Sequence, residues 1–494
     1  MNGSLLYRDG ADFTEFGGDD FYRDLRLDAV LAEIAGAGGI DGRYRQKPAK
    51  LGDVQFRQAV LYDLERPEIR KIAEDFTNRY CQYQTCLAYA RDLPQRQTRQ
   101  KWLLDGACAF CGCVVGLHDS LAKAVPRSEG FRRFLGCLDE YIRSEQFAAL
   151  NRDAGRCAER LSDVRYTLDV WLYQNKVAVK AGDGCAEDYC ARLASVFRRF
   201  DVDDSYRMVP FPGVNMEALE LAVLDRLCEL FPGEFALLGD FCARHPAAGA
   251  DLIDTFASEL RFYQRHIAYM DRMRQRGYAF SQPAFCQRRA VSIAGGYDLS
   301  LAQAAATTPV TPNDFDLEAG QSCIVTGPNQ GGKTACLRMV GQIAYFASLG
   351  LPAPCRHAEL YFIGGIYTHF AREEDLSNHY GRLKEELQRA RRILDGMPPG
   401  SVILFNDLFS STTAFDAAQI GRLLLDRLSA HGCLCLFATN LQELAETGKG
   451  PVLHAAPDDG GAYRLMPPPS GQAFAGRRLA AHLLRRQDIR SRVK

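Results

Sequence analysis

The sequence has almost no net charge and no long hydrophobic run. It holds 60 Lys and Arg against 61 Asp and Glu over 494 residues, a formal net charge of -1. A chain with this balance is not drawn to nucleic acid as a whole, so any DNA contact needs a local basic patch. No apolar stretch approaches the ~20 residues of a membrane span, and no secretory signal opens the chain. These absences predict a cytoplasmic protein without a membrane segment.

Internal repeats and low-complexity tracts are also absent, and the 17 cysteines are scattered through apolar stretches. In a cytoplasmic protein such cysteines are expected to be buried thiols rather than a disulfide framework. One cluster, Cys108, Cys111 and Cys113 with His118 nearby, leaves a zinc site open as an alternative. The apolar residues around it recur at helical spacing, which favours the buried face of a helix.

Hydrophobic periodicity divides the chain into two parts. Up to about residue 283 the pattern is mainly helical, as in the segment through Ile253, Leu260 and Ile267. β-Branched and aromatic residues near 163–180 predict a small β insertion there. From about residue 291 short apolar strands alternate with helices, which is typical of a parallel α/β sheet. We therefore expect an N-terminal extension at 1–45, a helical domain at 46–283, an α/β domain at 284–470 and a basic helical tail at 471–494.

A complete phosphate-binding motif, G-x-x-x-x-G-K-T, follows the short apolar strand at 323–325. Its residues are Gly327, Pro328, Asn329, Gln330, Gly331, Gly332, Lys333 and Thr334. The glycines allow several backbone N–H groups to turn toward phosphate oxygens. Lys333 can reach the β- and γ-phosphates, and the Thr334 hydroxyl can bind Mg²⁺. The helix expected to begin at Thr334 places its positive N-terminus behind the phosphates.

Polar side chains follow two further apolar strands. The strand at 402–405 ends in Asn406 and Asp407, and the strand at 433–437 runs into Thr439 and Asn440. Ligands of parallel sheets bind at this carboxyl edge. Between the two strands, a Ser/Thr run at 410–413 precedes a helix whose free N–H groups form a second anion-binding surface. An ordinary strand end or helix cap is the alternative for each feature alone, but their order after the P-loop favours a nucleotide site.

These motifs together closely resemble the ATPase segment of the MutS family. The run TGPNQGGKT at 326–334 is similar to that family's TGPN-x-GGKST, and 312–314 is similar to its VPND turn. The segments 404–416 and 438–440 resemble its LLDE-x-GRGTST-x-DG and ATH segments, and 349–354 resembles its G-x-x-VPA stretch. Far upstream, Arg57-Gln58 followed by Asp63-Leu64 resembles the start of the family's helical core. The resemblance is strong over about 310–445 and weak before 280.

The resemblance implies a mainly α-helical core/lever domain followed by an α/β P-loop NTPase domain with an ABC-ATPase-like sheet. It implies an ATPase that uses ATP and Mg²⁺ and pairs as a homodimer, with its levers forming a clamp on DNA. Thr334, Asn406 and Asp407 would then hold Mg²⁺, partly through water, and Asp407 and Asn440 would be catalytic. Ser411, Thr412 and Thr413 would complete the nucleotide site of the partner. Only about 40 residues precede the helical core, too few for the family's mismatch-reading domain, so we expect branched or distorted DNA as the target.

Several residues depart from the family pattern. The usual Asp-Glu pair is Asn406-Asp407, in which Asn406 offers Mg²⁺ a neutral oxygen and Asp407 is one methylene shorter than Glu. The GRG of the signature is Phe409-Ser410-Ser411, and the switch His is Asn440, which cannot titrate near neutral pH. These departures predict a slow ATPase, or one in which nucleotide binding matters more than turnover.

Some expectations leave alternatives open. Tyr297 is placed to stack on adenine, with a core position as the alternative. The candidate phosphate contacts of DNA, for which a solvated helix face is the alternative, are Arg91, Arg96, Arg99, Lys101, Arg485, Arg486, Arg490, Arg492 and Lys494. A nucleotide-gated protein-assembly factor with slow or no turnover and little DNA affinity is a second function. An ABC-type ATPase is a third, but it predicts an LSGGQ-like signature, which the sequence lacks.

Overall fold

The computed structural model describes residues 3–17, 20–171, 176–182, 216–246, 249–305, 309–371, 381–409, 412–445, 450–458 and 461–468. The chain forms two compact units. Unit 1 comprises Met1–Asp63, Arg127–Phe131 and Ser258–Lys494, and unit 2 comprises Leu64–Pro126 and Arg132–Ala257. The domain boundaries expected near residues 45, 283 and 470 stay predictions, and the basic tail at 471–494 lies outside the described residues.

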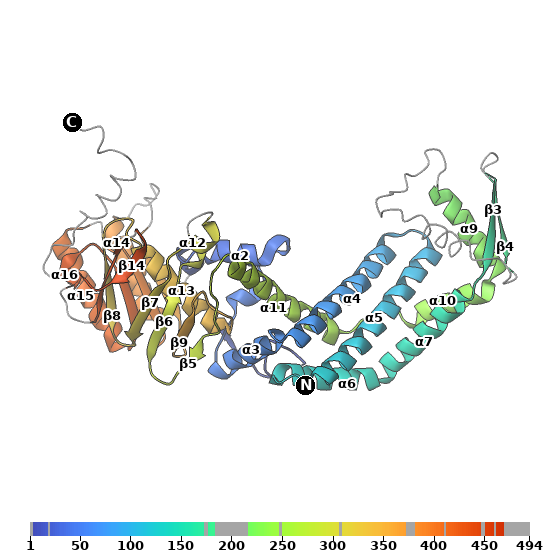
Figure 1. Ribbon diagram of the computed structural model, residues 1–494, viewed down its shortest axis with the longest axis horizontal. Coiled ribbons are helices and arrows are strands. Elements are labelled where there is room, and N and C mark those ends of the chain that lie inside the picture. Colours follow the sequence, from blue (N-terminus) through green and yellow to red (C-terminus); the bar gives the residue numbers. More distant parts are fainter. Residues whose placement is uncertain are drawn as a thin grey trace, which may run out of the picture. The chain divides into compact units, whose positions relative to one another are not determined.

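Unit 2 is helical with one small sheet. Its helices are α4 Pro67–Asp92, α5 Arg96–Ala124, most of α6 Glu129–Arg143, α7 Glu145–Ser162, α9 Met216–Leu230, α10 Pro232–Arg244 and the first turns of α11 Asp251–Gln275. The long helices α4 and α5 lie side by side (Figure 1). Strands β3 Tyr166–Trp171 and β4 Lys176–Ala181 pair antiparallel in the segment where the sequence predicts strands. Aromatic rings fill the interior, and those of Phe134 and Phe256 stack with centroids 3.8 Å apart.

Unit 1 contains a six-stranded sheet in the order β10-β11-β12-β8-β13-β14. The strands are β8 Ser322–Thr326, β10 Ile366–Phe370, β11 Val402–Asn406, β12 Leu434–Ala438, β13 Val452–Pro457 and β14 Tyr463–Met466. All neighbouring pairs are parallel except β13 and β14. Every residue of β8, β11 and β12 is buried, which explains why these strands are continuous apolar runs in the sequence.

Helices follow several strands of this sheet, and unit 1 also contains a second, smaller sheet. The helices are α13 Lys333–Leu349, α14 Arg382–Gly396, α15 Ala414–Ala430 and α16 Gln442–Ala445. The second sheet has the order β5-β9-β6-β7, formed by β5 Ala284–Phe285, β6 Ala290–Gly296, β7 Asn313–Glu318 and β9 His357–Leu360, with α12 Leu299–Ala304 after β6. The predicted fold class, a mainly helical part followed by an α/β P-loop domain, is confirmed. Of the helices that the structure describes, none combines the length and apolar character of a membrane span.

The N-terminal segment belongs to unit 1, which the sequence did not predict. It contains β1 Phe13–Thr14, α1 Asp20–Asp24, α2 Leu27–Ala35, the 3-10 turns Gly36–Gly38 and Gly42–Arg45, β2 Lys47–Pro48 and α3 Leu51–Leu64. The rings of Phe16 and Phe21 contact that of Tyr345 on α13, with centroids 4.8 and 5.7 Å apart. The Ile366 amide donates to the Phe16 carbonyl at 2.8 Å, so this segment also pairs with the edge strand β10.

The Arg57-Gln58 and Asp63 positions are buried structural contacts. The Arg57 guanidinium donates to the carbonyls of Leu6 at 3.2 Å and of Leu349 at 3.4 Å. Leu349 is the last residue of α13, so Arg57 satisfies a carbonyl at the end of the P-loop helix. The Asp63 carboxylate accepts from the amides of Arg127 and Ser128 at 2.9 and 2.7 Å.

Candidate nucleotide-binding site

The P-loop joins strand β8 to helix α13, as the sequence predicts, and its glycines are sterically required. Gly327 has a φ of +142° and Gly332 one of +99°, values that side chains rarely allow. A Cβ at Gly327 would lie 2.2 Å from the Ala455 carbonyl oxygen, and one at Gly331 would lie 2.5 Å from the same atom. The backbone of β13 therefore presses directly on the loop and fixes its curvature.

Lys333 is the cation of this loop, and its side chain is buried. Its ammonium donates to the carbonyls of Gly327 at 2.7 Å and Pro328 at 3.2 Å, and to the Asn440 amide oxygen at 2.8 Å. Burial lowers the pKa of Lys333, and the nearby Asp407 carboxylate acts in the opposite direction. The ammonium is thus held over the loop, where β- and γ-phosphates of a nucleotide would lie.

Oxygen atoms suited to Mg²⁺ gather at the ends of α13 and β11. The Thr334 hydroxyl donates to the Asn406 amide oxygen at 3.1 Å. Neighbouring ligands of an octahedral Mg²⁺ at 2.0–2.1 Å lie roughly 3 Å apart, so this pair fits the ion. Burial raises the pKa of Asp407, whereas the Lys333 charge opposes that rise. Thr334 and Asn406 can hold the ion directly, and Asp407 supplies the one carboxylate of the predicted set.

Backbone strain is concentrated around these residues. Among the described residues five other than glycine have a positive φ, and three of them, Gln330, Asp407 and Phe409, lie in the predicted site segments. Phe409 is the most unusual of these three, because a bulky residue adopts a φ of +64°. Its ring is 1% exposed and belongs to the core cluster that includes Ala417 and Leu444. Core packing therefore holds a strained turn directly after the predicted metal ligands.

Asn440 connects the end of strand β12 to the P-loop. Its amide oxygen accepts from Lys333, and its amide nitrogen donates to the Asn329 side-chain oxygen at 3.1 Å. The preceding Thr439 amide donates to the Val325 carbonyl at 3.0 Å, which aligns the ends of β12 and β8. The structure thus brings Asn440 and Lys333 into direct contact, whereas their roles in catalysis stay predictions.

A cavity of about 680 Å³ opens beside the P-loop. Its lining includes the loop residues Gln330 to Gly332, helix α12 and strand β14. Tyr463 on β14 is 37% exposed and lies against Gly332, where an added Cβ would be 3.7 Å from it. The size and mixed lining suit the base and sugar of a nucleotide.

The residues that build the wall of this cavity were not predicted from the sequence. The Asn313 side chain donates to the Tyr463 carbonyl at 3.2 Å and accepts from the Leu465 amide at 2.8 Å. Asp314 accepts from the Gly295 amide at 2.7 Å. The Pro-Asn-Asp segment at 312–314, where strand β7 begins, therefore positions the β13–β14 hairpin over the cavity. A signal was present in that segment, but nothing local indicated its partners some 150 residues away.

The structure does not support ligand roles for Tyr297 or for the cysteine cluster near Cys111. Tyr297 is 2% exposed, its hydroxyl donates to the Ala279 carbonyl at 2.9 Å, and its ring packs near Tyr278, so the core alternative describes it although it borders the cavity. Burial raises the pKa values of Cys111 and Cys113 to about 12. Within the described part of the chain, no group of His, Cys, Asp or Glu side chains could hold a metal, so the geometry gives no support to zinc.

The predicted trans signature is only partly described. Ser411 lies outside the described residues. Thr413 is the N-cap of α15, where its hydroxyl accepts from the Asp416 amide at 3.2 Å and donates to the Asp416 carboxylate at 2.8 Å. Thr412 is partly buried beside it. A role in a partner's site stays a prediction.

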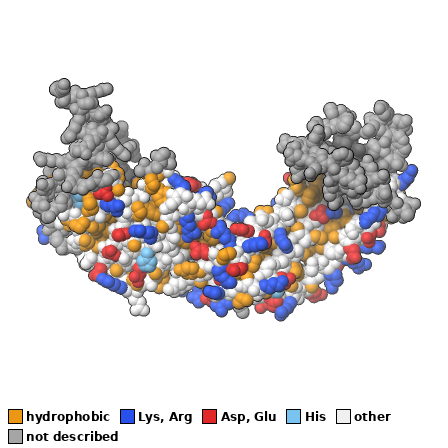
Figure 2. Space-filling view, in the orientation of Figure 1, with side chains coloured by type: hydrophobic (Ala, Val, Ile, Leu, Met, Phe, Trp, Pro, Cys, Tyr) orange, Lys and Arg blue, Asp and Glu red, His pale blue; other side chains and the backbone are white. Residues whose placement is uncertain are grey.

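The four basic residues predicted on the helical part have different surroundings. Lys101 pairs with Asp105 on the same helix. Arg91 and Arg99 line a cavity of unit 2, and Arg96 is exposed at the start of α5. Figure 2 shows basic and acidic side chains interleaved over the visible face, in keeping with the small net charge.

Comparison with known proteins points to one family. Residues 323–452 match the family model MutS domain V. The chain is 28% identical to DNA mismatch repair protein msh3 of Botryotinia fuckeliana over 208 residues, which cover 40% of this chain and 18% of that protein. It is 29% identical to DNA mismatch repair protein MutS of Thermus thermophilus over 174 residues, or 34% of this chain and 21% of the relative. Over 142 residues it is 33% identical to DNA mismatch repair protein MSH3 of Arabidopsis thaliana, and these residues cover 28% of this chain and 13% of that protein. The chain therefore spans about a fifth or less of the length of each relative.

Proposed function

The chain carries a MutS domain V and belongs to the MutS family, and from this premise we propose that it binds and hydrolyses ATP and acts on DNA as a dimeric clamp. We propose branched or otherwise distorted DNA as its target rather than base mismatches. The observation that carries the proposal is the Lys333 ammonium, held at 2.7–3.2 Å by two loop carbonyls and Asn440. Beside it stands the Thr334–Asn406 oxygen pair.

In this proposal the protein positions the nucleotide along the P-loop. The loop N–H groups and Lys333 bind the phosphates, and the nucleoside occupies the cavity beside Tyr463. Mg²⁺ held by Thr334 and Asn406 would neutralise charge on the phosphates. The Asp407 carboxylate, whose pKa burial raises, orients the attacking water and takes its proton.

Asn440 supplies a way to sense the γ-phosphate. Its amide oxygen shares the Lys333 ammonium with the loop carbonyls. A γ-phosphate competes for the same ammonium, so its arrival releases Asn440 and changes the contact with Asn329. The end of β12 thereby adopts a different arrangement with and without ATP, as a nucleotide switch requires.

Exposed apolar side chains on α15 support a homodimer. Phe415 is 71% exposed and Leu423 is 67% exposed, on the helix whose N-cap is the signature residue Thr413. Such side chains are more favourable when a partner covers them. A second copy placed on this helix would bring the signature segment to the nucleotide of the first.

The proposal is tested by steady-state ATPase assays with and without single-stranded, duplex and four-way-junction DNA. We expect a slow basal rate that the junction stimulates most. DNA binding should fall steeply between about 50 and about 200 mM salt, because phosphate contacts release counterions. ATP binding with no hydrolysis under any condition, or no DNA affinity at low salt, would overturn the respective half of the proposal.

A second candidate function is a nucleotide-gated protein-assembly factor with little DNA affinity. The neutral amide of Asn406 favours it, because a site with one carboxylate fewer should hold Mg²⁺ more weakly and turn over slowly. The same assays separate the two. Tight ATP binding, no hydrolysis and no DNA binding at low salt together would establish the assembly factor.

A further inference from the structure

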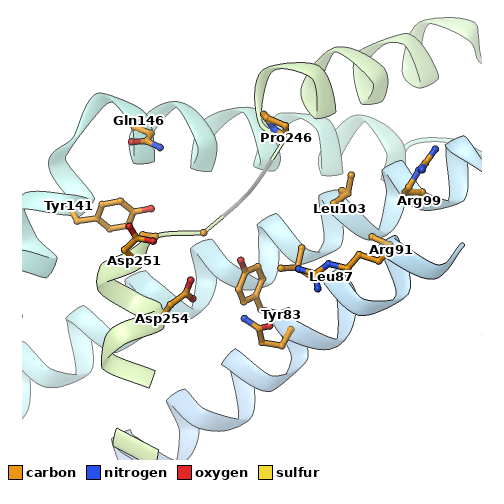
Figure 3. Close-up of a pocket in the computed structure, with 14 residues that line it drawn as sticks. Tyr83, Leu87, Arg91, Arg99, Leu103, Tyr141, Gln146, Pro246, Asp251 and Asp254 are labelled. Atoms are coloured by element: carbon orange, nitrogen blue, oxygen red, sulfur yellow. The ribbon is translucent and has the colours of Figure 1, made fainter. Parts of the chain in front are cut away.

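Unit 2 contains a second cavity, of about 940 Å³, which the proposed ATPase cycle does not use. It opens between helices α4, α5, α6, α7 and α11 (Figure 3). The two ends of the cavity carry side chains of different chemistry. Arg91 and Arg99 lie at one end, and Tyr141, Asp251 and Asp254 at the other, with Tyr83 between them (Figure 3).

The basic end suits an anion such as phosphate. Arg91 is in the last turn of α4 and Arg99 in the first turns of α5. Among the described residues neither guanidinium has a hydrogen bond or an ion pair. The planar guanidinium presents paired N–H donors that match a phosphate, and the nearby N-terminus of α5 adds positive potential.

The opposite end offers aromatic faces and carboxylates. Asp254 accepts from the Tyr80 hydroxyl at 2.6 Å through one oxygen, which leaves its second oxygen for a ligand. Asp251 stands in the first turn of α11 and lines the same end of the cavity. Burial raises the pKa values of Tyr83 and Tyr141 to about 12, so both hydroxyls stay protonated donors.

The chain close to Tyr83 also limits the shape of the cavity. A Cβ added at Gly249 would lie 2.8 Å from the Tyr83 hydroxyl, which is closer than such contacts allow. Glycine therefore lets the segment before α11 approach the tyrosine. The Tyr83 hydroxyl is thereby held close to this segment.

We propose that this cavity binds a nucleoside monophosphate group, with guanine preferred. The phosphate lies between Arg91 and Arg99, and the base lies against Tyr83 and Tyr141. Guanine carries two adjacent donors, N1–H and the 2-amino group, which together match the two oxygens of one carboxylate, here Asp251. The volume falls within the range of small-ligand sites, roughly 300–1,000 Å³. The ligand is either free GMP or one guanosine residue of a single strand, since both present the same groups.

The test uses the full chain carrying Lys333→Ala, so that the P-loop does not contribute. Isothermal titration with GMP and AMP, and fluorescence anisotropy with short oligo-dG and oligo-dA, report on the two sources. The Arg91→Ala/Arg99→Ala double variant should weaken GMP or oligo-dG binding by about tenfold or more, because charge-assisted hydrogen bonds to phosphate are lost. Lys123→Ala, on the same helix as Arg99 but outside the lining, is the matched control and should leave binding unchanged. Asp251→Asn should reduce the preference for guanine over adenine.

The outcomes are distinct. Loss of GMP binding in the double variant alone supports a free-nucleotide site, and loss confined to oligo-dG supports capture of a strand. Binding of neither ligand, or equal binding by the double variant and the control, overturns the site. Equal affinity for GMP and AMP that Asp251→Asn does not alter overturns the base assignment. ATP binding by the unmodified chain is measured separately. A negative result for GMP and oligo-dG therefore does not bear on the proposed ATPase function.

Discussion

In unit 1 the groups that would face a nucleotide are the backbone amides and side chains of eight consecutive residues and of the ends of β11 and β12. Of these side chains, Lys333 and Asn406 are buried. In unit 2 the groups around the second cavity are side chains from five helices, and the charged ones among them are exposed. The first arrangement is fixed before any ligand arrives, because β13 presses on Gly327 and Gly331 and core packing holds Phe409. The second must order long arginine side chains on binding, which costs conformational entropy.

The difference teaches where each site is vulnerable. A rigid, strained loop loses its conformation when a substitution adds even one carbon atom. A surface cavity at helix ends keeps its conformation after most substitutions and loses only the ligand contact of the replaced side chain. We therefore expect substitutions in the P-loop to have large effects on both folding and binding. Matched substitutions in unit 2 should have small effects, or effects of the opposite sign.

The largest effect is expected for Lys333→Ala. It removes the ammonium that donates to Gly327, Pro328 and Asn440, and with it the only motif cation for the phosphates. ATP affinity should fall by about 1,000-fold or more, since charge-assisted hydrogen bonds contribute 1.5–3 kcal/mol each. Equilibrium binding of fluorescent ATP measures this affinity. Lys123→Ala on α5 of unit 2 is the control. Unchanged ATP affinity in Lys333→Ala would show that Lys333 does not bind the nucleotide.

Acid should weaken unit 1 before unit 2. His266 is buried between the rings of Tyr44 and Phe346, and burial lowers its pKa from 6.5 to about 4. Below pH 6.5 the unfolded chain binds a proton that the folded unit refuses until about pH 4. Stability is therefore complete above pH 6.5 and is lost as the pH falls toward 4, by about 3 kcal/mol in all.

Hydrogen exchange measured peptide by peptide across this pH interval checks the expectation. In unit 2, His245 instead hydrogen-bonds Asp153 at 2.9 Å, and this bond lowers the pKa of Asp153. That contribution is kept until the pH falls below the ordinary range of an aspartate. His266→Leu should reduce the acid sensitivity of unit 1 and leave the part that His369 contributes, because burial lowers the pKa of His369 to about 3. Equal loss of protection in both units at the same pH would contradict the comparison.

Matched glycine substitutions should change stability in opposite directions. Gly327→Ala places a Cβ 2.2 Å from the Ala455 oxygen at a φ of +142°, so unit 1 should lose about 2–3 kcal/mol. Gly112 lies in the middle of α5 with nothing within 4 Å of an added Cβ, so Gly112→Ala should stabilise unit 2 by about 0.5–1 kcal/mol. Denaturant titration of each variant gives both values. A neutral Gly327→Ala would show that the loop can relax away from β13.

The smallest effect is expected for Asn406→Asp. The new carboxylate keeps an oxygen for the Thr334 hydroxyl and adds a charge, so Mg²⁺ should bind about three- to tenfold more tightly. Mg²⁺ titration in the presence of ATP measures this, and turnover should rise with it. Asn151→Asp on α7 of unit 2 serves as the control. Weaker Mg²⁺ binding or slower turnover would show that Asn406 is adapted to another task.

Most of the P-loop domain could be predicted because its information is local. The loop from Gly327 to Thr334 is contiguous, and the strands that end at Asn406 and Ala438 are continuous apolar runs. Parallel strands buried on both faces leave this pattern in any sequence. The fold class followed from these segments and is confirmed, and residues 323–452 match the family model MutS domain V.

Other parts of the site were invisible because their partners are distant in the chain. The Ala455 carbonyl lies close to Gly327, and the Asn313 side chain binds backbone atoms of Tyr463 and Leu465. These backbone atoms carry no residue-type signal. Phe409 shows the same limit. Its position after Asp407 was evident, but its left-handed backbone and its burial were not, because the core that tolerates this strain comes from several elements.

The sequence by itself determined that this chain has a P-loop, a parallel sheet behind it and polar residues at the ends of two strands. Spacing and side-chain type suffice for these features. Only the tertiary structure decided that the N-terminal segment packs on α13 and β10, and that Arg57 reaches the end of the P-loop helix. It alone brought Arg91, Arg99 and Asp251 around one cavity. The physical reason is that packing joins residues through shape and burial, which leave no mark at any fixed distance along the chain.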